Sequence, residues 1–318
     1  GTDGSAERRA GRGYEGSGSE VGGGRIVDHL TQWGMAVSIG HRAELVHDAD
    51  VVIHSTAIDA QNAELEEARR RDIPVIRRAE MLAEAMRSKL GIAIAGTHGK
   101  TTTTALIAHL LVQAGLDPSA LVGGRLRGHP DRIEGAIIGA GDWLVTEADE
   151  SDGSFLELSP CIAVITNIDA DHLDHFGDME NLEAAFLSFA RNLPFWGLCV
   201  VCSDHPRVRA LAQRIPGRVL RYGTGDSAEL KAQALSSDAM GMRFWVERGG
   251  SQHGEIELPL PGVHNVENAH AALRVALEVG VPFADSAAAP ASSRRLASRL
   301  HHNGRVPARV DSGHCREV

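Results

Sequence analysis

Glycine, lysine and threonine gather in residues 96–102, Gly-Thr-His-Gly-Lys-Thr-Thr. These residue types suit phosphate binding, because consecutive backbone N–H groups can surround phosphate oxygens while lysine neutralises charge and a threonine hydroxyl binds Mg²⁺. The usual G-x-x-x-x-G-K-[ST] spacing is incomplete, because Ile94 occupies the first glycine position. A β-branched residue favours strand geometry, so we expect a later, tighter turn with Gly96 and Gly99 at its permissive backbone positions. The alternative is an ordinary turn with a solvated Lys100, but the pattern favours nucleotide binding.

The residues around this glycine–lysine loop (residues 96–102) predict a strand before it and a helix after it. An apolar run at 91–95 precedes the loop, and Gly115 occupies the place expected for a helix C-terminal cap. Apolar residues recur between them at helical spacing, at Leu106, Ile107, Leu110 and Leu111. The helix N-terminus would therefore point toward an anion.

Three later apolar runs are each followed at once by polar or acidic residues. The runs and their polar segments are 143–146 with 147–152, 163–166 with 167–172, and 198–202 with 203–204. In open parallel sheets the ligand crevice lies outside the carboxyl ends of the strands. We therefore expect these segments and the glycine–lysine loop to form one site.

A magnesium ion fits this predicted site, because Mg²⁺ prefers oxygen ligands and is usually held by one or two carboxylates plus substrate phosphates. Thr101 and Glu147 are the candidate ligands. The acids of 147–152 can equally be solvated or lie at a helix start, where the macrodipole favours them. The residues alone do not favour metal binding over these structural interpretations.

Histidine and asparagine supply weaker candidates. His172 follows a predicted buried strand, which favours a role in the crevice, although an Asp/His pair at a helix start also serves as a cap. His264, Asn265 and Asn268 precede or begin a predicted helix that continues to Leu277. Their side chains can read an adenine edge or cap that helix, and the pattern leaves both open.

Composition limits the class of protein. The 318 residues are 43% hydrophobic and carry a formal charge of −10, which predicts a globular α/β protein of about two domains that does not bind nucleic acid. No apolar stretch reaches the length of a membrane span and no signal peptide is visible, so we expect a cytosolic protein with no membrane partner. Of the four cysteines, Cys199 and Cys202 lie in one apolar run, so they should be buried on opposite faces of a strand.

The chain divides into four predicted segments. Residues 1–25 form a Gly-rich leader, and 26–90 form a small βα domain with a parallel sheet. Residues 91–285 form the nucleotide-binding domain, and 286–318 form an Arg/Ser-rich tail without a core pattern. In the second segment we expect strands near 35–39, 51–54 and 73–76, and helices at 60–70 and 78–87.

Together these motifs closely resemble the Mur ligase family. The resemblance rests on GTHGKTT at 96–102, EADESD at 147–152, NIDADHLD at 167–174 and PGVHNVENA at 261–269, in this order. It implies a partial Rossmann-like N-terminal domain and a central P-loop ATPase domain. The motifs are most similar to those of family members that join L-alanine to UDP-N-acetylmuramate in bacterial peptidoglycan synthesis. The resemblance implies that the reaction uses ATP and Mg²⁺ and passes through an acyl phosphate.

The resemblance also implies roles for individual residues. Lys100, Glu147 and His172 are the implied catalytic residues, Thr101, Glu147 and His172 bind or orient Mg²⁺, and Asn167 lies near the reacting carboxylate. The implied nucleotide contacts are Gly96, Thr97, His98, Gly99, Lys100, Thr101, Thr102, His264, Asn265 and Asn268.

Three departures from the family pattern qualify these expectations. Residues 13–20 keep only part of the Gly-rich pattern of the loop that opens the family's first domain. No lysine occurs between Lys100 and Lys231, so that segment cannot contain the carbamylated lysine found in several relatives. The tail resembles nothing in the family's third domain, so we expect that domain to be absent. The sequence therefore predicts a truncated chain whose ends are not the family's own, and slow ligation even where ATP binds.

Overall fold

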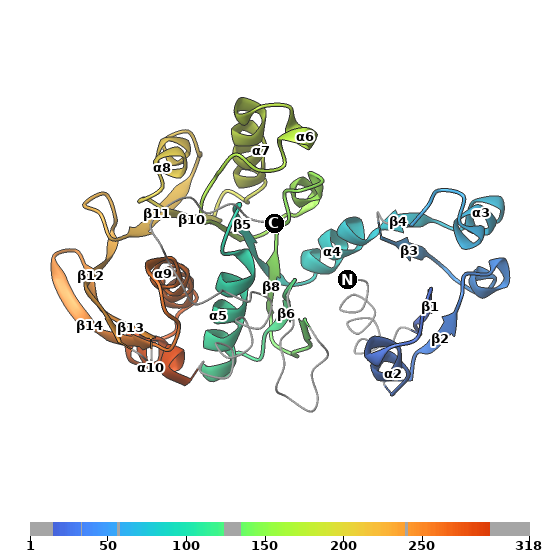
Figure 1. The fold of residues 1–318 in the computed structure, drawn as a ribbon, viewed down its shortest axis with the longest axis horizontal. Helices are drawn as coiled ribbons and strands as arrows, with labels where there is room; N and C mark the ends of the chain where they lie inside the picture. Colours follow the sequence, from blue (N-terminus) through green and yellow to red (C-terminus); the bar gives the residue numbers. More distant parts are fainter. Residues whose placement is uncertain (1–14, 33, 56–57, 124–134, 239–240, 293–318) are drawn as a thin grey trace, which may run out of the picture.

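A mostly parallel, ten-stranded sheet holds the glycine–lysine loop near its middle (Figure 1). This computed structural model describes residues 15–32, 34–55, 58–123, 135–238 and 241–292. In spatial order the strands are β14 (Ser251–Leu258), β13 (Gly241–Arg248), β12 (Leu230–Asp238), β11 (Arg218–Gly223), β10 (Leu198–Cys202), β9 (Ile162–Ile165), β5 (Leu90–Ala95), β8 (Trp143–Glu147), β6 (Ser119–Leu121) and β7 (Ala136–Ile137). Neighbours from β12 to β6 pair in parallel, while β7, β13 and β14 pair antiparallel. The predicted α/β class is confirmed.

Helices cover both faces of this sheet, as the buried strands require. One face carries α5 (Lys100–Gln113), α9 (Val263–Glu278) and α10 (Phe283–Ser292), and the other carries α4 (Arg78–Arg87), η2 (Ser154–Glu157), α6 (Leu173–Phe176), α7 (Met179–Arg191) and α8 (Pro206–Ala212) (Figure 1). Side chains alternate between the two layers along each strand: Ile92 and Ile94 pack on the first, Ala93 on the second. Cys199 and Cys202 are buried in opposite layers, as predicted.

The N-terminal part lies beside this sheet and reaches it through α4 (Figure 1). Its elements are β1 (Ser17–Glu20), α2 (Arg25–Gln32), β2 (Ala36–Ile39), η1 (Ala43–Val46), β3 (Val52–His54), α3 (Ala63–Arg70) and β4 (Val75–Arg77). The strands form two separate parallel pairs, β1–β2 and β3–β4, rather than the single sheet expected. Among the described residues, neither β1 nor β2 pairs with β3 or β4.

Both predicted segment boundaries at the ends need correction. Strand β1 lies inside the segment expected to be a leader; its sequence, Ser-Gly-Ser-Glu, has no apolar residue, so only backbone pairing with β2 forms it. Helix α10 crosses residue 285 and packs against β14 and α5, where Ala289 is buried. The rest of the expected leader, 1–14, and of the tail, 293–318, lies outside the described residues.

No helix in the described part of the chain is long and apolar enough to cross a membrane.

A buried histidine in α9 makes folding sensitive to pH. His270 packs edge-on against the rings of Tyr222 and Phe244, and burial is the main cause that lowers its pKa from 6.5 to about 3, with Asp204 raising it and Arg274 lowering it further. The unfolded chain therefore binds a proton below pH 6.5 that the folded chain does not, so stability should fall as the pH drops toward 3. Between pH 7 and 5 this group alone should remove about 2 kcal/mol from the free energy of unfolding.

Urea unfolding at both pH values checks this prediction, with His270→Gln as the non-titrating comparison. We expect the variant to lose less stability than the wild type on acidification. An identical loss in the two proteins would contradict the assignment to His270.

Candidate nucleotide-binding site

The glycine–lysine loop connects the end of β5 to the start of α5, as the sequence predicts. Gly96 has φ +136° and Gly99 has φ +84°, both outside the usual range of L-residues. A Cβ atom on Gly96 would lie 2.0 Å from Thr166 Oγ1, and one on Gly99 would lie 2.4 Å from Asn268 Oδ1. At both positions glycine is therefore required for two reasons: the positive φ angle and the lack of space for a Cβ atom.

Lys100, the first residue of α5, has its ammonium group within the loop. Its Nζ donates to both carboxylate oxygens of Glu150, at 2.9 and 3.0 Å, and to the carbonyl oxygen of Gly96 at 2.7 Å. The Lys100 side chain is 13% exposed and that of Glu150 only 1%. The buried Glu150 carboxylate thus holds the Lys100 ammonium group beside the loop, where it would neutralise phosphate oxygens.

Glu150 is the residue that the sequence interpretation missed. It belongs to the acidic segment 147–152, but four acids there gave no reason to prefer one over another. The one sequence feature that could have identified Glu150 as a site residue is its position three residues after Glu147. Only the path of the chain after β8 shows that Glu150 turns inward.

Thr101 and Glu147, the two residues predicted to bind Mg²⁺, lie next to each other. Thr101 Oγ1 donates to Glu147 Oε2 at 3.1 Å, and the backbone N–H of Gly123 donates to Glu147 Oε1 at 2.5 Å. Burial raises the pKa of Glu147, while these hydrogen bonds and Lys100 lower it and Asp149 raises it again. A half-buried carboxylate next to a hydroxyl is an all-oxygen donor set, which fits Mg²⁺.

Asn167 fastens the loop to the end of β9. Its Oδ1 accepts from the His98 backbone N–H at 2.7 Å, its Nδ2 donates to the His98 carbonyl oxygen at 3.0 Å, and its own carbonyl accepts from Thr97 N at 3.2 Å. Both ends of the side-chain amide are therefore used to shape the loop. The predicted contact of Asn167 with a reacting carboxylate stays a prediction.

The segment after Asn167 also contacts the loop. The Asp169 backbone N–H donates to Thr97 Oγ1 at 2.9 Å, and the Asp169 carboxylate lies 3.8 Å from His98 Nε2 and 3.2 Å from His205 Nε2. His172 is the N-cap residue of α6, with φ +53°, and its ring Nε2 lies 3.7 Å from the Asp171 carboxylate. In the described part of the chain no hydrogen bond or ion pair joins His172 to Thr101 or Glu147, so its metal role stays a prediction.

The first turns of α9 support the loop from the other side. Asn268 Oδ1 accepts from Thr103 Oγ1 at 3.2 Å and lies over Gly99, which places this helix directly against α5. Of the two alternatives that the sequence left open for these asparagines, capping of α9 is not observed: Gly262 is the N-cap, and Asn265 lies inside the helix with its Nδ2 donating to the Pro261 carbonyl oxygen. His264 is exposed beside them.

The third predicted segment, 203–204, joins this site only indirectly. Asp204 accepts from the backbone N–H groups of Thr224 and Gly225 and so organises the turn after β11. Its neighbour His205 reaches Asp169. Two of the three acidic segments therefore contact the glycine–lysine loop directly, and the third serves the neighbouring turn.

The sequence comparisons agree with this geometry. The Mur ligase middle domain matches residues 94–276, and the Mur ligase family catalytic domain matches residues 3–90. The chain belongs to the Mur ligase family. These two matches divide this Mur ligase chain close to residue 90, where β5 starts.

Curated relatives of this Mur ligase carry the name UDP-N-acetylmuramate–L-alanine ligase. Those from Solidesulfovibrio magneticus and Aromatoleum aromaticum are each 46% identical over 99% and 98% of this chain, and the one from Pelobacter propionicus is 47% identical over 89%. The chain spans 61% to 68% of the length of these three relatives.

Solved structures show the same architecture. A UDP-N-acetylmuramate–alanine ligase from Thermotoga maritima matches with a TM-score of 0.78 and 28% identity, covering 91% of this chain and 66% of that one. A UDP-N-acetylmuramate:L-alanyl-γ-D-glutamyl-meso-diaminopimelate ligase from Neisseria meningitidis matches with a TM-score of 0.79 and 26% identity, covering 90% and 93%.

These matches correct the expectation that the chain's ends are foreign to the family. The N-terminal domain match begins at residue 3, and the alignment with the Solidesulfovibrio relative covers 99% of the chain. The Gly-rich start and the Arg-rich end are therefore aligned with family members, although their composition obscured this.

Proposed function

We propose that this Mur ligase catalyses the ATP-dependent joining of L-alanine to the lactyl carboxylate of UDP-N-acetylmuramate in the bacterial cytosol. The observation that carries the proposal is the arrangement of Lys100, Thr101 and Glu147 at the carboxyl ends of β5 and β8, in a chain 46% identical to ligases of that name. Transfer of the γ-phosphoryl group to the carboxylate would form an acyl phosphate, and the alanine amine would then displace phosphate to form the amide.

The residues of this chain would act mainly by electrostatics and position. Backbone N–H groups of the loop and the N-terminus of α5 would hold the phosphates, and Lys100 would neutralise charge on the transferring group. Thr101 and Glu147, with His172 as a further candidate, would hold Mg²⁺, which supplies charge neutralisation across the phosphate oxygens. Asn167 would keep the loop in its binding shape, and Asn265, Asn268 and His264 would border the base.

A second candidate has its own support. The Neisseria ligase, whose name specifies a tripeptide instead of alanine, superposes as well as the alanine ligase does. The two reactions share the nucleotide, the sugar and the acyl phosphate, and differ only in the amine. Fold alone therefore does not separate them, whereas the identity of the curated relatives favours alanine.

The test separates activation of the carboxylate from choice of amine. With ATP, Mg²⁺ and UDP-N-acetylmuramate, hydroxylamine should trap the acyl phosphate as a hydroxamate without any amino acid. With L-alanine in place of hydroxylamine, UDP-N-acetylmuramoyl-L-alanine should form, and the tripeptide L-alanyl-γ-D-glutamyl-meso-diaminopimelate should not replace it. Hydroxamate that does not depend on UDP-N-acetylmuramate would reject the proposed substrate, and ATP binding without any hydroxamate would favour a non-catalytic nucleotide-binding fragment.

A substitution at Glu147 tests the metal site. In Glu147→Ala the half-buried carboxylate beside Thr101 is lost, so the gain in ATP affinity on adding Mg²⁺ should be at least about tenfold smaller than in the wild type. Calorimetry of ATP binding with Mg²⁺ and with EDTA measures the difference.

Asp149→Ala is the matched control for Glu147→Ala, because Asp149 is an exposed acid in the same segment. Its Mg²⁺ dependence should remain that of the wild type. If ATP binding depended equally on Mg²⁺ in the wild type, Glu147→Ala and Asp149→Ala, Glu147 would not be a metal ligand.

A further inference from the structure

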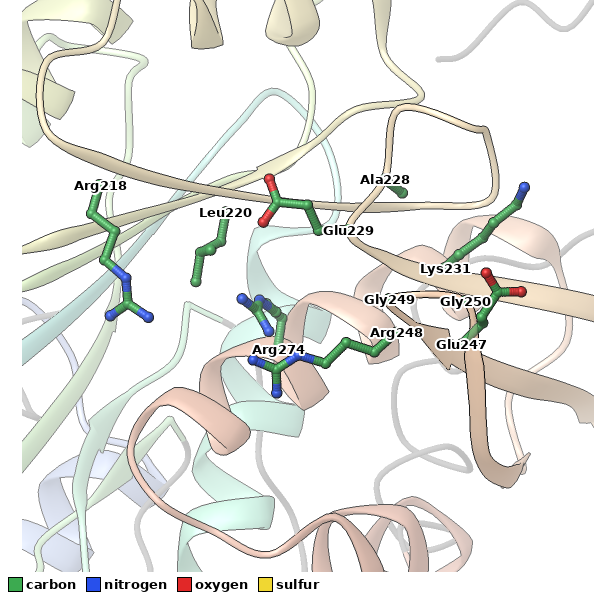
Figure 2. Close-up of a pocket in the computed structure, with 10 residues that line it drawn as sticks. All are labelled: Arg218, Leu220, Ala228, Glu229, Lys231, Glu247, Arg248, Gly249, Gly250 and Arg274. Atoms are coloured by element: carbon green, nitrogen blue, oxygen red, sulfur yellow. The ribbon is translucent and has the colours of Figure 1, made fainter.

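A second, basic pocket lies away from the glycine–lysine loop, between strands β11 to β13 and helix α9. The loop follows β5, and strands β9 and β10 separate β5 from β11 in the sheet. The pocket has a volume of about 430 Å³, and Arg218, Arg248, Arg274 and Lys231 supply its positive charges (Figure 2). It shares no lining residue with the nucleotide site, and its volume falls in the range of small-molecule sites.

Arg274 is buried in this pocket with part of its guanidinium unused. Its side chain is 3% exposed, and Nη2 lies 3.1 Å from Glu278 Oε1 one turn further along α9. Among the described residues, Nε and Nη1 have no hydrogen-bond partner. Buried donors are normally paired, because an unsatisfied one costs its desolvation energy, so these two donors indicate a missing acceptor.

The acids around Arg274 do not supply that acceptor. Glu278 is shared with Arg218, whose Nη2 lies 2.5 Å from Oε2, and Glu229 pairs with Arg221 at 3.1 Å. Figure 2 shows the Arg248 side chain extending toward Arg274, and within the described residues Arg248 forms no ion pair.

The positive charge at Arg274 is therefore incompletely balanced. Burial lowers the pKa of Arg274, Glu278 raises it, and the neighbouring positive charge of Arg248 lowers it again. A bound anion would offset both the burial and the repulsion between these two arginines.

We propose that this pocket binds a small metabolite through a phosphate group held between Arg274 and Arg248. The two guanidinium groups come from different elements, α9 and β13, so their donors approach from two directions. A carboxylate has two oxygens in one plane and satisfies a single guanidinium fork, whereas a tetrahedral phosphate presents oxygens to both. The remaining volume accommodates the rest of a small phosphorylated molecule.

Titration with inorganic phosphate tests the proposal by calorimetry at constant ionic strength, with chloride as the replaced anion. The glycine–lysine loop can also bind phosphate, so the titration is repeated in the double variant Lys100→Met with Glu150→Gln, which removes the cation of that loop without leaving the buried Glu150 carboxylate unpaired. We expect saturable binding to persist in this double variant and to weaken about tenfold or more when Arg248→Ala is added. Because Arg248 is exposed, its loss should leave the fold intact.

Arg243→Ala is the matched control, because Arg243 is exposed on the same strand and pairs with Asp238 and Glu257 outside the pocket. It should leave phosphate affinity unchanged. Phosphate binding that disappears in the double variant Lys100→Met with Glu150→Gln, or that is unchanged by Arg248→Ala, would overturn the proposal. Succinate bound as tightly as phosphate would overturn the assignment to a phosphate group. None of these results depends on ligase activity.

Discussion

Lys100→Ala is expected to weaken ATP binding about 100-fold or more. Lys100 is the one cation of the glycine–lysine loop, and charge-assisted hydrogen bonds to phosphate are the strongest contacts that such a loop makes. The substitution also leaves the Glu150 carboxylate, 1% exposed, without its partner. Breaking a buried pair in this way costs about 3 kcal/mol or more of stability, so loss of binding by itself would not distinguish a chemical role from partial unfolding.

A double variant separates the two effects. Lys100→Met combined with Glu150→Gln removes both charges while keeping similar volumes, so stability should return toward the wild-type value while ATP affinity stays low. Lys231→Ala, which removes a lysine paired with the exposed Asp226 outside this site, controls for net charge and should bind ATP normally. Urea unfolding and calorimetry on the same samples measure both quantities. Full ATP affinity in the stable double variant would reject the role given to Lys100.

Gly96→Ala should be the most destabilising single-methyl change in the nucleotide site. The new Cβ atom would lie 2.0 Å from Thr166 Oγ1 and 3.1 Å from the Asn167 backbone, and φ +136° is unfavourable for alanine. Since Asn167 holds His98 in place, pushing the end of β9 away would also open the loop. We expect a loss of about 3 kcal/mol or more in the free energy of unfolding, together with loss of ATP binding.

Gly115→Ala isolates the backbone component of this effect. Gly115 follows α5 with φ +74°, but a Cβ atom there would meet nothing within 4 Å. This variant should lose only about 1–2 kcal/mol, the cost of a left-handed alanine, and should bind ATP as the wild type does. Equal losses in the two variants would show that crowding against Thr166 does not matter.

The sequence by itself determined the strand–loop–helix unit of the nucleotide site. Its indications were local: two glycines and a lysine at close spacing, an apolar run of strand length before them, and apolar residues at helical spacing after them. The positive φ angles of Gly96 and Gly99 and the start of α5 at Lys100 confirm that interpretation. The parallel sheet was predictable for the same reason, because β5, β8, β9 and β10 are short apolar runs that end in polar residues.

Tertiary structure alone decided which polar residues meet. Glu150 rather than its acidic neighbours pairs with Lys100, because the chain turns inward after β8. Asn268, 165 residues beyond Thr103, reaches that residue only because α9 packs against α5. Strand β1 and the arginines of the basic pocket show the same limit: backbone pairing and burial join segments that are distant in sequence, and no local pattern of residue types records those partners.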